Sequence, residues 1–202
     1  MTMKSLLLVF AKTPVLGTVK KRLATTVGAE KALSVYTQLL RKTNTILEEL
    51  AQEVIVFYSG AEASTLQDYF PTFKLNAQKG TDLGERMQQA FQWGFSQGYK
   101  NLILIGTDLW EIETPLISLA FKQLQTHDCV IGPSTDGGYY LLGKKQNIPA
   151  VFQNKAWSTA SVLTNTLADL QDHQVALLPE KTDIDTYKEV ELYPELVHLI
   201  YR

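Results

Sequence analysis

The chain is short of cysteine, of excess charge and of long hydrophobic runs, and each shortage excludes a class of protein. Its single cysteine, Cys129, lies in an apolar stretch and can form neither an intramolecular disulfide nor a thiolate cluster. The longest apolar runs, such as residues 6–11, fall far short of the ~20 residues that a membrane helix needs. A net charge of −2 lacks the clustered positive charge of a nucleic-acid surface. We therefore expect no membrane span, no nucleic-acid partner and a buried thiol.

The N-terminus carries one Lys and no small-residue cleavage site after a long apolar core, so we expect no signal peptide and a cytoplasmic location. The 202 residues, 45% of them hydrophobic, suit a globular domain with a full core. We predict one domain over residues 1–202, with no linker or repeat.

Apolar strand-like runs alternate with helical patterns along the chain. The predicted strands are 4–11, 53–58, 101–105 and 128–132, with 139–142 and 174–178 weaker. The predicted helices are 29–50 and 83–97, with weaker ones at 62–69, 114–125, 159–171, 186–192 and 195–200, the last two separated at Pro194. This order predicts an α/β fold, with a mostly parallel sheet and helices on both faces. Residues 139–142 are expected to form a short antiparallel element.

A basic loop follows the first strand. Lys12, Lys20 and Arg22 can neutralise a di- or triphosphate, and Gly17 permits close approach of the backbone. The loop has neither the P-loop spacing nor the G-x-G-x-x-G fingerprint. Its alternative interpretation is a solvated basic loop. Ligands of such sheets bind at the carboxyl ends of the strands, where this loop and three other motifs are expected to converge.

Carboxylates in two of those motifs suit a divalent cation. Asp108 directly follows a buried strand, where it can hold Mg²⁺ or Mn²⁺ against a diphosphate, or simply form a turn or helix cap. Asp183 and Asp185 are two residues apart, so in an extended segment both point to one side and could complete that site. The alternative there is a capping box formed by Thr186 and Glu189.

Asp136 lies in a Gly-rich turn over residues 132–138. The turn permits close approach of a substrate. Alternatively, it is an ordinary Asp-Gly hairpin turn, in which Asp136 has no catalytic role. The three histidines have no spacing typical of a zinc site, and no Ser/His/Asp or Cys/His constellation is visible.

A further motif opens the predicted helix 83–97. Asp82 and Glu85 form a helix N-terminal signature, which capping alone explains. The functional interpretation has Gln78 and the Gly80 backbone touching a base, and Arg86 touching a phosphate or the acceptor.

Taken together, the motifs resemble a bacterial family of candidate glycosyltransferases, the DUF2064 group, within the nucleotide-diphospho-sugar transferase superfamily. In chain order they are Phe10-Ala11-Lys12-x-Pro14-x-x-Gly17-x-Val19-Lys20-x-Arg22-Leu23, Gln78-x-Gly80-x-Asp82-Leu83-Gly84-x-Arg86, Ile105-Gly106-Thr107-Asp108, Gly132-Pro133-x-x-Asp136-Gly137-Gly138-Tyr139-Tyr140-Leu141-Leu142-Gly143, Trp157-Ser158-Thr159 and Asp183-Ile184-Asp185-Thr186. Any one motif is weak, whereas the whole set in this order is specific.

The resemblance implies a GT-A-like fold and a role for each motif. It implies that the basic loop binds nucleotide phosphates, that Asp108 binds the metal with Asp185 or Asp183 as second ligand, and that Gln78 and Gly80 read the base. Two positions depart from the family pattern. Lys21 replaces a usual Thr, and Leu109-Trp110 replaces a usual Cys-Pro, where Trp110 could stack on a base or sugar or reshape the acceptor side.

These motifs favour a metal-dependent transferase that uses a nucleoside-diphosphate sugar and a small-molecule acceptor, with Mg²⁺ or Mn²⁺ as cofactor. Asp136 is the candidate to bind the acceptor hydroxyl or act as its base. One alternative is a nucleotidyltransferase that joins an NTP to a small phosphorylated molecule, although the glycine-rich signature of sugar nucleotidyltransferases is missing. Another is a non-catalytic nucleotide-binding protein.

Overall fold

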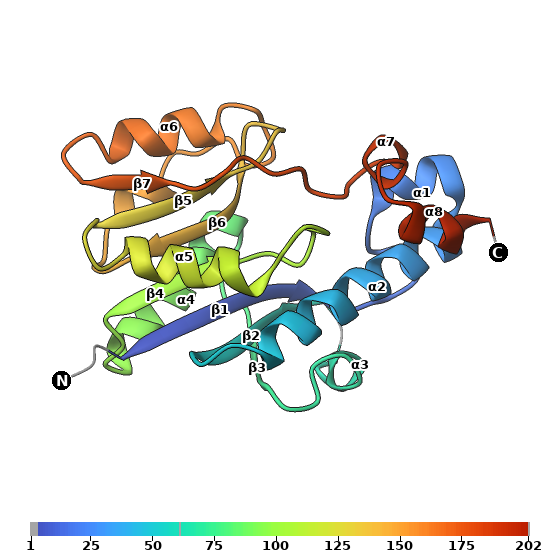
Figure 1. Ribbon diagram of the computed structural model, residues 1–202, viewed down its shortest axis with the longest axis horizontal. Helices are drawn as coiled ribbons and strands as arrows, with labels where there is room; N and C mark the ends of the chain where they lie inside the picture. Colours follow the sequence, from blue (N-terminus) through green and yellow to red (C-terminus); the bar gives the residue numbers. More distant parts are fainter. Residues whose placement is uncertain (1–3, 61, 202) are drawn as a thin grey trace.

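The computed structural model describes residues 4–60 and 62–201. The strands are β1 (Ser5–Lys12), β2 (Glu53–Ser59), β3 (Lys74–Ala77), β4 (Asn101–Ile105), β5 (Cys129–Pro133), β6 (Tyr139–Lys144) and β7 (Val175–Leu177). The helices are α1 (Lys21–Val27), α2 (Ala29–Glu48), α3 (Ser64–Gln67), α4 (Leu83–Ser96), α5 (Thr114–Gln123), α6 (Val162–Asp169), α7 (Tyr187–Val190) and α8 (Pro194–Ile200), with a 3₁₀ turn, η1 (Pro149–Phe152). Figure 1 shows one central sheet with helices beside it, and with α1, α7 and α8 beyond its right-hand end.

The strands form a seven-stranded sheet in the order β3-β2-β1-β4-β6-β5-β7. All neighbouring pairs are parallel except those made by β6, which runs antiparallel to both β4 and β5. The predicted α/β fold with a mostly parallel sheet is therefore confirmed, as is the antiparallel element at 139–142. Because β5 and β6 form a hairpin, their connecting turn lies at the carboxyl edge of the parallel strands.

Alternate side chains of β1 show why its apolar run is continuous. Leu7 and Val9 pack into a core beneath α2 and α5, whereas Leu6 and Leu8 pack into a second core beneath α4 and η1. A strand covered by helices on both faces has no polar side, so its sequence does not alternate. This double coverage confirms the prediction of helices on both faces of the sheet.

A third apolar cluster lies beyond the carboxyl ends of the strands. It joins α1, the first half of α2, α7 and α8, which gather at the right of Figure 1. Ile184, in the segment before α7, is buried within this cluster. The cluster fixes the basic loop and the last acidic motif against each other at the edge where ligands of such sheets bind.

Three elements were not predicted from the sequence. The edge strand β3 is only partly buried, so it lacks the apolar run that marks the other strands. The short helix α1 begins inside the predicted basic loop, and η1 is a single turn. The predicted break at Pro194 is confirmed, because α8 begins there as Pro at its first helical position.

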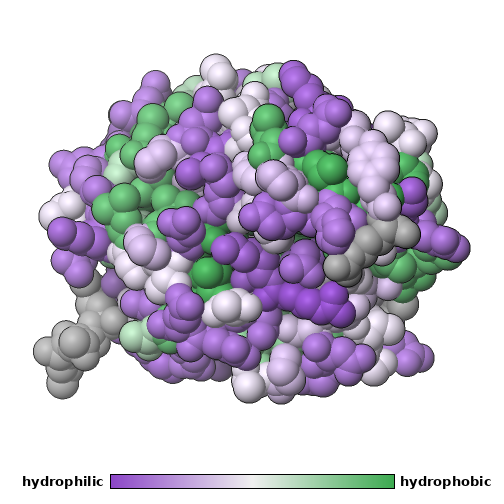
Figure 2. Space-filling view, turned by 45° about the vertical axis from the view of Figure 1, so that its right-hand side comes forward, coloured by the Kyte–Doolittle hydropathy of each residue, from purple (hydrophilic) through white to green (hydrophobic). Residues whose placement is uncertain are grey.

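The exposed large hydrophobic side chains come from separate elements: Leu16, Leu83, Leu119, Leu177, Leu192 and Tyr201. On the face drawn in Figure 2 the hydrophobic residues form small patches between hydrophilic ones. Within the described ranges, every helix is too short or too polar to cross a membrane. Cys129 is fully buried, and burial raises the pKa of its thiol to about 11, as expected of a structural thiol.

Lys144 on β6 is fully buried, which is unusual for a lysine. Its Nζ lies 4.4 Å from the ring centroid of Phe91 and 4.3 Å from that of Phe152, and 3.5 Å from the carbonyl oxygen of Ile148. Burial lowers the pKa of Lys144 to about 7, with the nearby Cys129 a weaker opposing influence. The two rings favour the cation, but their attraction does not replace the lost water.

We expect Lys144→Met to flatten the dependence of stability on pH. Between the folded pKa of about 7 and the ordinary value of 10.5, the unfolded chain holds a proton that the folded chain lacks. Lys144 therefore makes the free energy of unfolding rise with pH in this window, by up to about 1.4 kcal/mol per pH unit. Urea denaturation from about pH 7 to about pH 10 measures this slope. Met keeps the length of the side chain without its proton.

Lys145→Met is the matched control. Lys145 follows Lys144 directly in the chain, but the Lys145 side chain is 28% exposed. This control should keep the wild-type slope and also the wild-type stability near neutral pH. Lys144→Met should be more stable than wild type near pH 7. Equal slopes for wild type and Lys144→Met would show that the buried amine does not titrate in this window.

Candidate functional site

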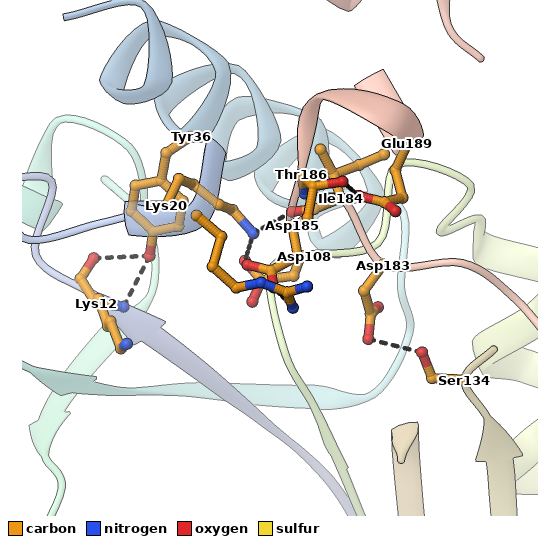
Figure 3. Close-up of polar contacts among 11 residues, drawn as sticks. Lys12, Lys20, Tyr36, Asp108, Ser134, Asp183, Ile184, Asp185, Thr186 and Glu189 are labelled. Carbon is orange, nitrogen blue, oxygen red and sulfur yellow. Dashed lines mark hydrogen bonds and ion pairs between the residues drawn. The ribbon is translucent and has the colours of Figure 1, made fainter. Parts of the chain in front are cut away.

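Lys20 is the centre of the polar cluster at the carboxyl edge of the sheet. Its Nζ donates to Asp108 Oδ1 at 2.6 Å and to the carbonyl oxygen of Ile184 at 2.5 Å (Figure 3). The Lys20 side chain is only 5% exposed, whereas that of Asp108 is 51% exposed. One ammonium thus connects the basic loop, the residue after β4 and the segment before α7.

The backbone of Lys20 is itself unusual. Lys20 precedes α1 with φ 46° and ψ 46°, in the left-handed region that a residue other than Gly rarely adopts. This conformation costs of order 1 kcal/mol or more, and it persists only where surrounding contacts fix it. Here those contacts are the ion pair with Asp108 and the hydrogen bond to Ile184.

A second ion pair joins the same two regions. Arg22 Nη1, on α1, lies 2.5 Å from Asp185 Oδ2. Both side chains are largely accessible, 72% and 44% exposed, so this pair adds little to stability. Two cations of the basic loop, Lys20 and Arg22, therefore neutralise two carboxylates of the acidic motifs, Asp108 and Asp185.

Lys12 and Gly17 occupy the remainder of the basic loop. The backbone N–H of Lys12 donates to the hydroxyl of Tyr36 at 2.8 Å, and that hydroxyl donates to the Lys12 carbonyl at 2.9 Å (Figure 3). Tyr36 on α2 therefore fixes the end of β1 and leaves the Lys12 side chain exposed. Gly17 lies in an exposed turn with φ 75°, a conformation that favours glycine.

Asp183 and Asp185 have different partners, although they are two residues apart. Asp183 Oδ2 accepts from the Ser134 hydroxyl at 3.0 Å, and Figure 3 shows its carboxylate directed toward Ser134. Burial and, as a smaller cause, the neighbouring charge of Asp108 together raise the pKa of Asp183 to about 6. The expected common side for the two carboxylates is therefore not seen. Asp183 and Asp108 are the electrostatic neighbours, and Asp185 pairs with Arg22.

The described part of the chain contains no group of three or more His, Cys, Asp or Glu side chains close enough to hold a metal. Asp108 and Asp183 together offer two carboxylates. Mg²⁺ and Mn²⁺ are commonly held by one or two carboxylates, with phosphate oxygens of the substrate as further ligands. This pair of hard oxygen donors fits such an ion.

Asp136 forms the turn that its alternative interpretation predicts. Its Oδ1 accepts from the backbone N–H of Gly138 at 2.9 Å, and the side chain is exposed. Gly137, with φ 86°, packs so closely that a Cβ would lie 2.3 Å from the carbonyl oxygen of Ala160. This turn is therefore fixed against the segment before α6. Asp136 also acts electrostatically on Asp183, so it borders the same cluster.

Hydrogen bonds within the chain tie down the motif before α4. Gln78 Nε2 donates to the Phe57 carbonyl at 2.9 Å, and Arg86 Nε donates to the Gly80 carbonyl at 3.1 Å. Asp82 caps the helix by accepting from the Glu85 N–H, as predicted. Base contacts by Gln78 and Gly80, and a phosphate contact by Arg86, stay predictions.

The capping box of Thr186 and Glu189 is confirmed at α7.

Trp110 packs against Tyr193, with 6.3 Å between ring centroids, and belongs to the third apolar cluster. That packing favours a structural role over stacking on a base. Trp157 packs on the second core and lies close to Gly84. A Cβ added at Gly84 would lie 2.7 Å from the Trp157 ring.

Sequence reasoning missed three parts of this cluster: the Ser134 hydroxyl, the Tyr36 hydroxyl and the carbonyl of Ile184. Tyr36 lies among the apolar residues of the predicted helix 29–50, and Ser134 lies inside the Gly-rich turn over residues 132–138. A polar hydroxyl on a buried helix face, opposite the end of a strand, is the signal that could have revealed Tyr36.

Comparison with known proteins places the chain among bacterial transferase-like folds. Residues 42–159 match the family described as "Uncharacterized protein conserved in bacteria (DUF2064)". No curated protein matches the sequence. A solved structure from Desulfovibrio desulfuricans G20, named as a candidate nucleotide-diphospho-sugar transferase, is 31% identical, with a TM-score of 0.92 over 99% of this chain and 98% of that one.

More distant solved structures share the fold alone. Rv0371C of Mycobacterium tuberculosis in complex with manganese has a TM-score of 0.61 at 14% identity, over 96% of this chain and 99% of that one. The inositol-1-phosphate CTP transferase of T. maritima has a TM-score of 0.60 at 14% identity, over 100% and 96%. A candidate sugar transferase and a nucleotidyl transferase are therefore both represented among its structural relatives.

We expect Tyr36→Phe to destabilise the protein by about 1–3 kcal/mol, because the backbone N–H and C=O of Lys12 both lose their partner while the ring packing is kept. Urea denaturation measures the difference. Tyr201→Phe, at a residue 72% exposed, is the control and should stay within about 0.5 kcal/mol of wild type. Equal stability of both variants would mean that water satisfies Lys12 as well as the hydroxyl does.

Proposed function

The chain belongs to the DUF2064 family, and from this membership and the geometry above we propose that it is a metal-dependent transferase that uses a nucleoside-diphosphate sugar. The sugar is transferred to a small-molecule acceptor. The observation that carries the proposal is the meeting of Lys20 with Asp108 and of Arg22 with Asp185 at the carboxyl edge of the sheet. Cations for phosphate and carboxylates for a metal lie within one cluster.

In this proposal the basic loop binds the diphosphate of the donor. Lys20 and Arg22 supply charge, Lys12 stands exposed at the end of β1, and the turn at Gly17 lets the backbone approach closely. As the bond between sugar and diphosphate breaks, negative charge grows on the leaving group. Cations fixed in advance stabilise that charge without having to reorganise, and the contacts of Lys20 with two other segments support such fixing.

Asp108 and Asp183 would hold Mg²⁺ or Mn²⁺, and the ion would neutralise charge on the departing diphosphate. Asp185 is the other candidate for the ligand beside Asp108. Asp183 is favoured, because Asp185 is paired with Arg22 and Asp183 is the electrostatic neighbour of Asp108. Gln78 and Gly80 would contact the base, and Arg86 a phosphate or the acceptor. Their position at the loop after β3, which also ends at the carboxyl edge, supports this placement.

Asp136 would bind the acceptor hydroxyl or accept its proton. Its exposed carboxylate belongs to a turn fixed by the close packing of Gly137, and it borders Asp183. A rigid turn is a suitable support for a group that must meet a hydroxyl in one orientation. In this role Asp136→Asn would lower turnover while the donor still binds.

Nucleotidyl transfer is the second candidate. It is favoured by the shared fold of the T. maritima inositol-1-phosphate CTP transferase. The same cations and carboxylates would then hold an NTP in line with an attacking phosphate. The two reactions differ in what they release, because sugar transfer yields a nucleoside diphosphate and nucleotidyl transfer yields pyrophosphate.

We expect one nucleotide class to raise the melting temperature in the presence of Mn²⁺, since a ligand that binds only the folded state stabilises it by mass action. The panel comprises UDP-, GDP-, CDP- and dTDP-linked sugars and the corresponding NTPs, each with Mn²⁺ or with EDTA. A ligand at about 100 times its Kd adds about 2.7 kcal/mol. A preference for a sugar nucleotide supports glycosyl transfer, and a preference for an NTP supports the second candidate.

The variant Asp108→Ala should lose the Mn²⁺-dependent part of the shift. Asp172→Ala is its matched control, an exposed aspartate before β7 at the opposite edge of the sheet, and it should respond like wild type. A chain that shifts with no nucleotide under any condition would contradict both transferase candidates.

A further inference from the structure

The groups proposed to hold phosphate and metal are bonded to each other in the structure. Lys20 Nζ contacts Asp108 Oδ1 at 2.6 Å, and Arg22 Nη1 contacts Asp185 Oδ2 at 2.5 Å. Each pair joins one cation of the basic loop to one acidic residue of a different segment. A ligand that takes one member of a pair from the other, here called exchange, lies close to the released member, whose charge has the same sign as its own.

Exchange with one ligand alone is unfavourable. A diphosphate that takes Lys20 from Asp108 leaves the Asp108 carboxylate beside new negative charge, which repels it. A divalent cation that takes Asp108 from Lys20 lies beside an ammonium that is 5% exposed and poorly screened. Either ligand alone therefore adds a repulsion that opposes its own attraction to the site.

Exchange with both ligands together removes the conflict. The diphosphate then faces Lys20, the cation faces Asp108, and the two ligands attract each other. The carbonyl oxygen of Ile184, 2.5 Å from Lys20 Nζ, holds the ammonium in place when Asp108 leaves it. A buried ammonium keeps a polar partner throughout, so its desolvation is never left uncompensated.

We propose that the Lys20–Asp108 ion pair couples the binding of a divalent cation to the binding of a diphosphate, because it disfavours each of the two alone. This inference rests on the proposed function and deepens it. In thermodynamic terms the metal and the diphosphate bind with positive coupling, and the coupling is reciprocal. Lys20 and Asp108 set its size because they form the bond that is exchanged.

Inorganic pyrophosphate is the probe, because it carries the diphosphate without a choice of base or sugar. Isothermal titration calorimetry measures its binding in EDTA and, separately, its binding as the magnesium complex; Mg²⁺ is also titrated alone. Wild type should bind the complex at least about fivefold more tightly than free pyrophosphate, which is the lower end of ordinary coupling between two sites. It should bind Mg²⁺ alone only weakly.

Variants of the pair should change binding in opposite senses. Asp108→Asn frees Lys20, so free pyrophosphate should bind about fivefold or more tightly than to wild type, and magnesium should no longer help. Lys20→Met frees Asp108, so Mg²⁺ alone should bind more tightly, while binding of the complex weakens. Both substitutions preserve approximate side-chain size, and circular dichroism melts show whether each variant folds.

The double variant separates exchange of a bond from a general change in charge. If Asp108→Asn acts by releasing Lys20, its gain in free pyrophosphate binding should vanish in the Lys20→Met background. If it acts only by removing a negative charge, the gain should persist there. Lys100→Met and Asp172→Asn, exposed residues at the amino edge of the sheet, are matched charge controls that should bind like wild type.

The inference is overturned if Asp108→Asn binds free pyrophosphate no better than wild type, if its gain survives without Lys20, or if wild type binds free pyrophosphate and the magnesium complex equally. Failure to bind the complex at all overturns it as well. The proposed function is judged separately by the nucleotide panel. A nucleotide-dependent shift there, together with equal binding of free and complexed pyrophosphate, would reject the exchange and keep the transferase.

Discussion

The ammonium of Lys20 is the contact on which the arrangement of this edge depends. It joins residues that are 88 and 164 positions away in the chain, Asp108 and Ile184, and it holds its own backbone in a left-handed conformation. Asp108 in turn accepts from the backbone N–H of Ile184 through its carbonyl, at 2.8 Å. The three segments therefore form a closed set of bonds, so moving any one of them disturbs the other two.

The strands were predictable because burial on both faces leaves a local mark. β1, β2, β4 and β5 are continuous apolar runs, and their predicted bounds differ from those in the structure by one residue at most. α1 and β3 leave no such mark. α1 contains two adjacent threonines with weak helix propensity, and only Leu23 of its seven residues is fully buried, so its helix depends on packing against α2 and α7.

The residue types of the candidate site were predictable, and their pairing was not. A basic loop after one strand and acidic residues after two others indicate phosphate and metal chemistry at one sheet edge. Which carboxylate meets which cation depends on the fold of residues far apart in the chain. Asp183 turns toward Ser134 and Asp185 toward Arg22, while Ile184 between them is buried in the third apolar cluster.

Two buried lysines show that burial of a charge alone does not indicate a site. Lys144 lies between two phenyl rings and one distant carbonyl, so its environment offers nothing that a ligand could exchange. Lys20 is also nearly buried, but its partner Asp108 is half exposed, so one side of the ion pair is open to solvent. An anion that approaches the cation from that side meets the exposed carboxylate of Asp108. The exposure of the partner, more than the burial of the lysine, makes Lys20 the residue through which ligand binding and fold are connected.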